Sequence, residues 1–353
     1  MIPVNIIKKL LPAISLHQHV EKQISNLLQA KLAAEFIKEK KPLSETLHYL
    51  QRNFFSILFL SIYQSLGISR EKCFFYGIIN HCLRGLVTGT DNLLDNEYKE
   101  MLRLNFPVEA QKFKSVMHIL LFDRFLFETI RTATTDKLIP EALEAELNQQ
   151  LFAAMVPIGA EEAGEEGGVK TILSPTEILQ SVHMYKGGHL LCLAFVAPAL
   201  VETGQAERVE LARQGIYSIG MALQVIDDLT DLYEDIQNRN HNYLLSAIHF
   251  KGTLPEQQAL EQILAGTRQE QPVDQLFPAT TTLVMERAIG EALAGFQRLE
   301  QAGYWLDRHR AMTLIRFIFT IRGVKNLLKL LPSAEVINAT LTGDPAQDIF
   351  SDP

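Results

Sequence analysis

Apolar residues along most of the chain recur every three or four positions, which is the spacing of one face of an α-helix. No stretch shows the alternation of apolar and polar residues that is typical of a half-buried β-strand. The pattern predicts helices over residues 21–38, 43–66, 69–95 and 107–127, from about 141 onwards, and over 174–185, 205–232, 255–264, 280–302 and 307–331. The apolar face of the fourth helix is predicted to consist of Phe113, Val116, Leu120, Phe122 and Phe127.

Two breaks interrupt the pattern without dividing the chain into domains. The glycine-rich acidic stretch Gly159–Gly168 is predicted to be a loop, and Gln237–Tyr243 a turn. The chain contains no internal repeat, no low-complexity block and no linker, and the residues after about 340 have the composition of a loose tail. We therefore expect residues 1–353 to form one all-α domain, a large bundle of ten or more helices.

Composition excludes several classes of function. The 353 residues carry a formal net charge of −8, which argues against a general affinity for nucleic acid or acidic lipid. The three cysteines lie far apart, which argues against a disulfide framework or a zinc site and favours a reducing, cytoplasmic location. The longest apolar runs, 54–63 and 190–201, are too short to span a bilayer, so we expect no transmembrane segment. Peripheral contact with a membrane through a greasy substrate is compatible with this composition.

Two acidic motifs each end a strongly apolar helix. The first, residues 91–97, reads DNLLDNE, and the second, residues 227–235, reads DDLTDLYED. Each places carboxylates at positions i and i+4, which lie on one helix face and repel each other. Mg²⁺ would offset this repulsion, because it takes hard oxygen ligands and bridges carboxylates to substrate phosphates. Either motif alone is also compatible with an ordinary solvated helix end. Together, at the rims of two apolar helices, they indicate a ligand with a charged head and a hydrocarbon tail.

These residues resemble the motifs of the trans-isoprenyl diphosphate synthase superfamily, which includes the polyprenyl synthetases and is related to the class I terpene synthases. The segment Leu223–Asp231 (LQVIDDLTD) is similar to the family's second aspartate-rich motif, including Gln224 three residues before the first aspartate. The segment Tyr185–Gly188 (YKGG) resembles the helix whose lysine binds diphosphate. Residues 120–127 (LLFDRFLF) fall where the family has an aspartate-containing helix.

The resemblance implies a helical bundle of the isoprenoid synthase type with a central apolar cavity. It also implies a homodimer and three Mg²⁺ ions held between the two motifs. The ions would neutralise the diphosphate leaving group, so that the allylic C–O bond of a prenyl diphosphate ionises in a pocket that excludes water. Asp228 is expected to join the metal-binding aspartates as a catalytic residue. The expected metal ligands are Asp91, Asp95, Glu97, Asp227, Asp231 and Asp235.

The resemblance also implies a set of substrate contacts. Lys186 is expected to bind the diphosphate, although a surface lysine whose stem covers apolar atoms is the alternative. The positions of Leu86 and Val87 often carry an aromatic residue that limits product length in the family, so their aliphatic side chains favour a long prenyl tail. The further expected contacts are Gln224, Arg239, His189 and Arg84, each of which is also compatible with an ordinary structural role.

Departures from the family pattern decide how the reaction is interpreted. The first motif reads DxxxD where the family has DDxxD. Chain-elongating members bind the diphosphate of isopentenyl diphosphate on a basic patch near the N-terminus, and here Lys40-Lys41-Pro42 is a poor substitute and Arg52 a possible one. The segment Asn238–Tyr243 resembles instead the basic stretch of squalene and phytoene synthases.

These departures favour a terpene-synthase-like enzyme that ionises one prenyl diphosphate and then cyclises or eliminates. Three alternatives stay open: a trans-prenyltransferase that elongates an allylic diphosphate with isopentenyl diphosphate, a squalene- or phytoene-like head-to-head condensation, and a non-catalytic partner of a prenyl synthase.

Overall fold

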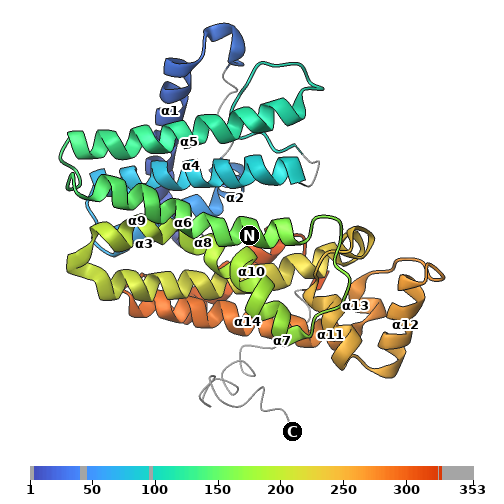
Figure 1. Ribbon diagram of the computed structural model, residues 1–353. Coiled ribbons are helices and arrows are strands. Elements are labelled where there is room, and N and C mark those ends of the chain that lie inside the picture. The colour runs from blue at the N-terminus through green and yellow to red at the C-terminus, as the bar shows by residue number, and fades with distance from the viewer. Residues whose placement is uncertain (1–3, 40–45, 95–97, 325, 328–353) are drawn as a thin grey trace.

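The chain folds as an all-α protein in a computed structural model that describes residues 4–39, 46–94, 98–324 and 326–327 (Figure 1). In the described part of the chain, the one β-type pairing is an isolated bridge between Ile37 and Leu104. The all-α fold class predicted from the sequence is confirmed. Asp95, Glu97, Lys40-Lys41-Pro42 and the tail after about residue 340 lie outside the described residues.

The helices follow one another with short connections. Short π- or 3₁₀-helical segments, labelled η, interrupt the α-helices at four places. In chain order the elements are α1 (Val4–Lys31), η1 (Ala34–Phe36), α2 (Thr46–Arg52), α3 (Phe54–Ser65), α4 (Arg70–Leu94), α5 (Gln111–Thr135), α6 (Leu143–Gly164), α7 (Pro175–Glu177), η2 (Ile178–His189), α8 (Leu190–Cys192), η3 (Leu193–Phe195), α9 (Val196–Val201), η4 (Thr203–Gln205), α10 (Ala206–Asn238), α11 (Tyr243–Lys251), α12 (Leu254–Leu264), α13 (Val273–Leu276), α14 (Pro278–Gln301) and α15 (Arg308–Ile321).

Two pairs of long helices form the frame of the bundle. Helices α4 and α5 lie side by side in the upper part of Figure 1, and α10 lies against α14 in the lower part. The second pair is closely packed, because a Cβ atom on Gly215 would lie 2.7 Å from the carbonyl oxygen of Gly295. Helices α11, α12 and α13 gather at one end of this pair. The buried apolar side chains of both pairs belong to one continuous core.

Several element boundaries differ from the predicted ones. Helix α1 begins at Val4 instead of residue 21, because Ile6 and Leu10 continue its buried face. Helix α5 begins at Gln111, after a turn that follows Pro107. Helix α10 continues to Asn238, so that only residues 239–242 separate it from α11.

The acidic stretch predicted as a loop is partly helical. Helix α6 continues through Gly164, which places Glu161 and Glu162 on its last turn. The chain leaves the helix only where Gly167 and Gly168 adopt positive φ angles of 84° and 85°, a conformation that glycine adopts without strain. The prediction of an irregular segment is correct for the second half of the stretch and wrong for the first.

The apolar face predicted for α5 points outward. Phe122 is fully buried, but Phe113, Val116, Leu120 and Phe127 are exposed. These four side chains, together with the exposed Phe152 and Val156 of the neighbouring α6, are called the α5–α6 stripe below. Helix α5 therefore has two apolar faces, and the periodicity identified the one that the single chain does not bury.

One helical stretch in the described chain, Pro175–Val201, is long and apolar enough to cross a membrane by length and composition alone. It contains η2, α8, η3 and α9, which pack against α10 and α6. Lys186 in its middle forms ion pairs within the bundle. These contacts are those of a core helix, which passes the same test of length and composition.

Candidate functional site

The second acidic motif lies in the C-terminal third of α10, and its first three aspartates have different surroundings. Asp227 is half-buried, Asp228 is buried and Asp231 is exposed. Residues four apart share a helix face, whereas adjacent residues are rotated by about 100°. Asp227 and Asp231 therefore point to the same side of α10, and Asp228 points into the protein.

Asp228 is the centre of a buried hydrogen-bond network. Its carboxylate oxygens accept hydrogen bonds from Nε2 of His183, at 2.9 Å, from Nε2 of Gln224, at 3.2 Å, and from the backbone N–H of Tyr243. Asn242, which caps α11, donates to the backbone oxygen of Asp228 at 2.8 Å. With its acceptor positions used in this way, Asp228 joins η2, α10 and α11. These contacts give Asp228 an anchoring position, and its expected catalytic role stays a prediction.

The carboxylates next to Asp228 have raised pKa values. Burial, opposed by the charge of Arg322 and assisted by those of Asp231 and Asp228, raises the pKa of Asp227 to about 6. Nη1 of Arg322 lies 3.3 Å from both carboxylate oxygens of Asp227. Burial and the same aspartate charges raise the pKa of Asp235 to about 7, although Asn242 donates to it. A divalent cation would relieve this concentration of like charge.

The first acidic motif ends α4. Asp91 is half-buried in its last turn, while Asp95 and Glu97 lie outside the described residues. Asn92 is buried, and its side chain both accepts from the backbone N–H of Lys99, at 2.8 Å, and donates to the backbone oxygen of Lys99, at 3.1 Å. Asn92 thus ties the chain that follows the motif back to the end of α4.

A series of contacts connects the first motif with the second. Arg84, two turns before Asp91, donates to Oδ1 of Asn53 at 3.1 Å, at the start of α3. The Phe55 ring, two residues later, lies 5.8 Å from the guanidinium carbon of Arg322, which in turn contacts Asp227. Neighbouring contacts therefore link α4, α3, α15 and α10, while a shared site for the two motifs stays a prediction.

Lys186, the predicted diphosphate contact, forms ion pairs with carboxylates of its own chain. Its ammonium lies 2.8 Å from Oε2 of Glu165 and 3.1 Å from Oε2 of Glu162. Burial lowers the pKa of Lys186, but these two charges outweigh burial and raise it to about 12. Lys186 is therefore fully charged in every ordinary buffer.

The two glycines that follow Lys186 fix its place against α10. A Cβ atom on Gly187 would lie 2.5 Å from the carbonyl oxygen of Gly220, and one on Gly188 would lie 2.4 Å from the ring of Tyr217. Only glycine permits this approach of η2 to α10. The close packing brings His183 and Lys186 to the helix that carries the second acidic motif.

The other predicted contacts lie in varied surroundings. The ring of His189 packs between Tyr185 and Tyr217, and burial lowers its pKa. Arg239 is exposed, has a φ of 59° and ends α10. Leu86 is buried and Val87 half-buried on α4, one turn before Asp91. The ion pairs of Lys186 with Glu162 and Glu165 were not predicted from the sequence, because the stretch that carries the two glutamates was expected to be a loop.

The carboxylates present fit Mg²⁺ by their chemistry. Among the described residues, no three histidine, cysteine or acidic side chains converge closely enough to hold a metal by themselves. Asp91, Asp227 and Asp231 instead supply hard oxygen donors from two helices. Mg²⁺ commonly binds through one or two carboxylates, with water and substrate phosphate completing its shell. A site divided in this way suits a metal that arrives with a diphosphate.

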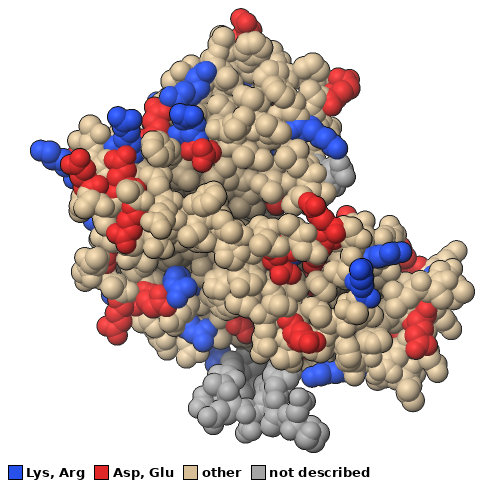
Figure 2. Space-filling view, in the orientation of Figure 1, with Lys and Arg blue, Asp and Glu red and all other residues tan. Residues whose placement is uncertain are grey.

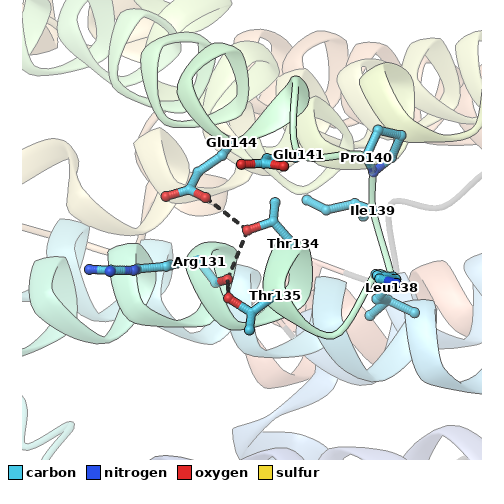
Figure 3. Close-up of a pocket in the computed structure, with 9 residues that line it drawn as sticks. Arg131, Thr134, Thr135, Leu138, Ile139, Pro140, Glu141 and Glu144 are labelled. Carbon is cyan, nitrogen blue, oxygen red and sulfur yellow. Dashed lines mark hydrogen bonds between the residues drawn. The ribbon is translucent and has the colours of Figure 1, made fainter.

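Two cavities in the described structure lie away from the acidic motifs. The larger, about 740 Å³, is lined by the end of α5 and the start of α6, where Thr134 donates to Glu144 (Figure 3). It therefore lies at the end of the bundle opposite to Asp91. The smaller, about 220 Å³, lies between α6, η2 and α10. Neither is the predicted central apolar cavity, although Figure 2 shows the surface hollowed between the tier of α4 and α5 and the part of the molecule below it.

The fold is similar to those of solved prenyl diphosphate synthases. Geranylgeranyl pyrophosphate synthetase from Pyrococcus horikoshii Ot3 matches with a TM-score of 0.58 and 14% identity, over 89% of this chain and 99% of that one. The synthetase of the same name from Geoglobus acetivorans matches with a TM-score of 0.56 and 17% identity, over 86% of this chain and 98% of that one. Octaprenyl pyrophosphate synthase from Helicobacter pylori matches with a TM-score of 0.56 and 12% identity, over 87% of this chain and 99% of that one. No family model matches the sequence, and no curated protein resembles it. The chain therefore has the isoprenoid synthase fold that its motifs predicted.

Proposed function

We propose that this chain, which has the fold of the prenyl diphosphate synthases, is a trans-prenyltransferase that elongates an allylic diphosphate with isopentenyl diphosphate. The observation that carries the proposal is a cluster of cationic and polar side chains around α4, two turns before the first acidic motif. It consists of Arg52, Asn53, His81, Arg84 and His17 and is called the Arg52–Arg84 cluster below. Elongation requires two diphosphate sites, and this cluster supports a second one.

The positive charge of the Arg52–Arg84 cluster is only partly balanced by neighbouring carboxylates. Arg84 donates to the side-chain oxygen of Asn53 and to the backbone oxygen of Arg52, so its guanidinium has no carboxylate partner among these contacts. Burial and the charge of Arg52 lower the pKa of Arg84, and Glu21 opposes this shift. Glu21 lies 3.6 Å from Arg52 and also accepts from Tyr49. A dianionic ligand would relieve the repulsion between the two guanidinium groups.

Three buried polar atoms in the cluster have no hydrogen-bond partner among the residues that the structure describes. They are Nε2 of His17, Nδ1 of His81 and Nδ2 of Asn53. Burial, followed by the charges of Arg84 and Arg52, lowers the pKa of His81 to about 3, so the imidazole is neutral. Unpaired buried polar groups cost free energy and usually indicate a ligand or an ordered water. A phosphate group bound by the guanidiniums would bring acceptor oxygens to the amide donor of Asn53 and to the ring of His81, which donates from one nitrogen when neutral.

The favoured interpretation thus changes from the one that the sequence suggested. The sequence offered no clear basic patch near the N-terminus, because Arg52 and Arg84 belong to different helices that only the fold brings together. The solved structures of similar fold are named geranylgeranyl and octaprenyl pyrophosphate synthases, which also favours elongation. Terpene-synthase-like cyclisation, head-to-head condensation and a non-catalytic role become outcomes of the test below.

Different residues of the chain would bind the metal, bind the two diphosphates and exclude water. Asp91, Asp227 and Asp231 would hold Mg²⁺, which supplies Lewis-acid neutralisation of the leaving diphosphate. Lys186 and Arg322 would bind the diphosphate of the allylic substrate. Phe55, half-buried beside Arg322, would help exclude water and stabilise a developing cation. The Arg52–Arg84 cluster would bind the diphosphate of isopentenyl diphosphate, and the carbon chain of this substrate would point toward the ionised allyl group.

We also propose that the protein is a homodimer. The α5–α6 stripe consists of exposed apolar side chains on two neighbouring helices, and exposed apolar patches often mark association surfaces. A second copy related by a two-fold axis would cover the stripe with an identical surface.

The test of the function is diphosphate release with Mg²⁺ from geranyl, farnesyl or geranylgeranyl diphosphate, with and without isopentenyl diphosphate. We expect release only when both substrates are present. Arg84→Gln should raise the KM for isopentenyl diphosphate more than tenfold, because a charge-assisted contact to phosphate contributes about 1.5–3 kcal/mol. Arg310→Gln, which removes an arginine that pairs with Asp307 on the surface, is the matched control. Release without isopentenyl diphosphate would refute elongation and favour cyclisation. A hydrocarbon formed from two allylic molecules would favour head-to-head condensation, and no release would favour a non-catalytic partner.

A further inference from the structure

The ion pairs of Lys186 differ in burial and length. The Lys186 side chain is 13% exposed, and its closer partner, Glu165 at 2.8 Å, is 8% exposed. The second partner, Glu162 at 3.1 Å, is 36% exposed. One buried carboxylate therefore holds the ammonium firmly, and one accessible carboxylate holds it from the solvent side.

The two glutamates occupy a place that is unfavourable for negative charge. Glu162 lies in the last turn of α6 and Glu165 follows directly, where the helix dipole repels carboxylates. Glu161 adds a third charge nearby, and burial followed by its glutamate neighbours raises its pKa although Lys186 opposes the shift. One ammonium thus faces more than one carboxylate. One oxygen of Glu165, Oε1, is also buried without a partner.

The end of α6 is tied to the helix that carries the second acidic motif. Beyond Glu165 the chain turns at Gly167 and Gly168, and the backbone N–H of Val169 donates to the carbonyl oxygen of Arg239 at 2.7 Å. Arg239 ends α10. The two glutamates therefore lie on a segment that is anchored beyond them to α10 and turns at residues with unrestricted backbone angles.

We propose that Glu165 is a positioning residue that orients Lys186, and that Glu162 occupies the place of a phosphate oxygen until diphosphate displaces it. The inference rests on the proposed function, because it takes Lys186 as the contact of the allylic diphosphate. An ammonium has three N–H donors, so Lys186 keeps its bond to Glu165 while it exchanges Glu162 for phosphate. Glu162 moves into solvent at little cost because it is already partly exposed. The exchange lowers diphosphate affinity, and Glu162 accepts from one N–H of the ammonium while no phosphate is bound.

Neighbouring substitutions of the same chemistry should therefore have opposite effects. Glu162→Gln removes the competitor and should tighten diphosphate binding about two- to fivefold, as expected for loss of a partly exposed charge. Glu165→Gln removes the orienting partner and should weaken binding by at least the same factor, because a buried charge pair is broken. Glu166→Gln is the matched control, since Glu166 is exposed.

The measurement is calorimetric binding of inorganic pyrophosphate with Mg²⁺ to the full chain, combined with mass-spectrometric measurement of Lys186 acetylation by a lysine-modifying reagent. In the wild type, pyrophosphate should change the acetylation rate of Lys186, and Glu162→Gln should increase that rate without ligand. Thermal melts by circular dichroism show whether each variant is folded, and Glu162→Gln alone still tests the proposal if Glu165→Gln unfolds.

The proposal is overturned if Glu162→Gln binds pyrophosphate no more tightly than Glu166→Gln, or if Glu165→Gln binds it as tightly as Glu162→Gln. It is also overturned if the wild type binds no pyrophosphate. Turnover separates this result from the proposed function. Pyrophosphate binding with the expected opposite shifts, but without release that depends on isopentenyl diphosphate, would refute elongation and retain the exchange at Lys186. In assays with the allylic substrate, Glu162→Gln should lower KM and leave kcat within about twofold.

Discussion

Replacing Gly187 by alanine tests the contact that positions Lys186, the expected diphosphate contact. The added Cβ would lie 2.5 Å from the carbonyl oxygen of Gly220 and 3.0 Å from Cβ of Gln224. Ordinary van der Waals separation is about 3.5–4.0 Å, so η2 must move away from α10 by about 1 Å. Overpacking of this kind costs about 1–3 kcal/mol. We expect Gly187→Ala to lower the free energy of unfolding by about 2 kcal/mol.

Gly290→Ala in α14 supplies the matched control. Gly290 lies inside a helix with no atom within 4 Å of the position of its Cβ. Alanine there should raise the free energy of unfolding by about 0.5–1 kcal/mol, because glycine loses more conformational freedom on folding. The same chemical change should thus have opposite signs at the two positions, with a difference of about 3 kcal/mol.

Urea unfolding monitored by circular dichroism measures both values, provided that the two variants show the same dependence on urea. The movement of η2 in Gly187→Ala should also lengthen the hydrogen bond from His183 to Asp228, so diphosphate release should fall more than stability alone explains. If Gly187→Ala were as stable as Gly290→Ala, the close approach of η2 to α10 would be wrong.

Three further predictions use single substitutions. Asn92→Asp, which restores the family's double aspartate, should lower the free energy of unfolding by about 1–3 kcal/mol, since a carboxylate cannot donate to the backbone oxygen that Asn92 binds; a more active and equally stable variant would contradict this. In urea titrations Asp228→Asn should lower the free energy of unfolding by a similar amount, whereas Asp231→Asn should stay within about 0.5 kcal/mol of wild type yet lose Mg²⁺-dependent diphosphate release. Equal stability of the two variants would exclude the anchoring role of Asp228. Leu120→Glu should convert a dimer into a monomer in light-scattering chromatography while the exposed Leu283→Glu should not, and a monomeric wild type would disprove the dimer.

Local patterns predicted the parts of the fold that depend on neighbours in the sequence. Ser69 accepts a hydrogen bond from the N–H of Lys72 at the start of α4. Ser174 and Glu177 form a reciprocal capping box at the start of the helical stretch that leads to Lys186. The spacing of Asp227 and Asp231 placed both on one face of α10. In each case the deciding atoms are within one helical turn of each other.

Contacts between distant segments escaped the sequence analysis. Nothing in the composition around Lys186 shows that Glu162 and Glu165 reach it, because that requires α6 to continue through a stretch rich in glycine. Arg322 lies 95 residues from Asp227 in the chain, and sequence spacing does not reveal such a partner. The orientation of α5 was also ambiguous, since both of its faces are apolar and only the position of α4 decides which is buried.

The geometry of a helix explains why the altered first motif retains Asp91, its expected metal ligand. In the second motif, the first aspartate of the pair faces Asp231, and the second is rotated by about 100° into the protein, where it joins three elements. In the first motif Asp91 corresponds to the first aspartate and Asn92 to the second. Asn92 is buried like Asp228, but it contacts a backbone N–H and a backbone oxygen of Lys99 at once, and only an amide both donates and accepts. The replacement of aspartate by Asn92 therefore falls on the buried position, where an amide binds the backbone of Lys99. Asp91, the carboxylate expected to bind metal, is kept.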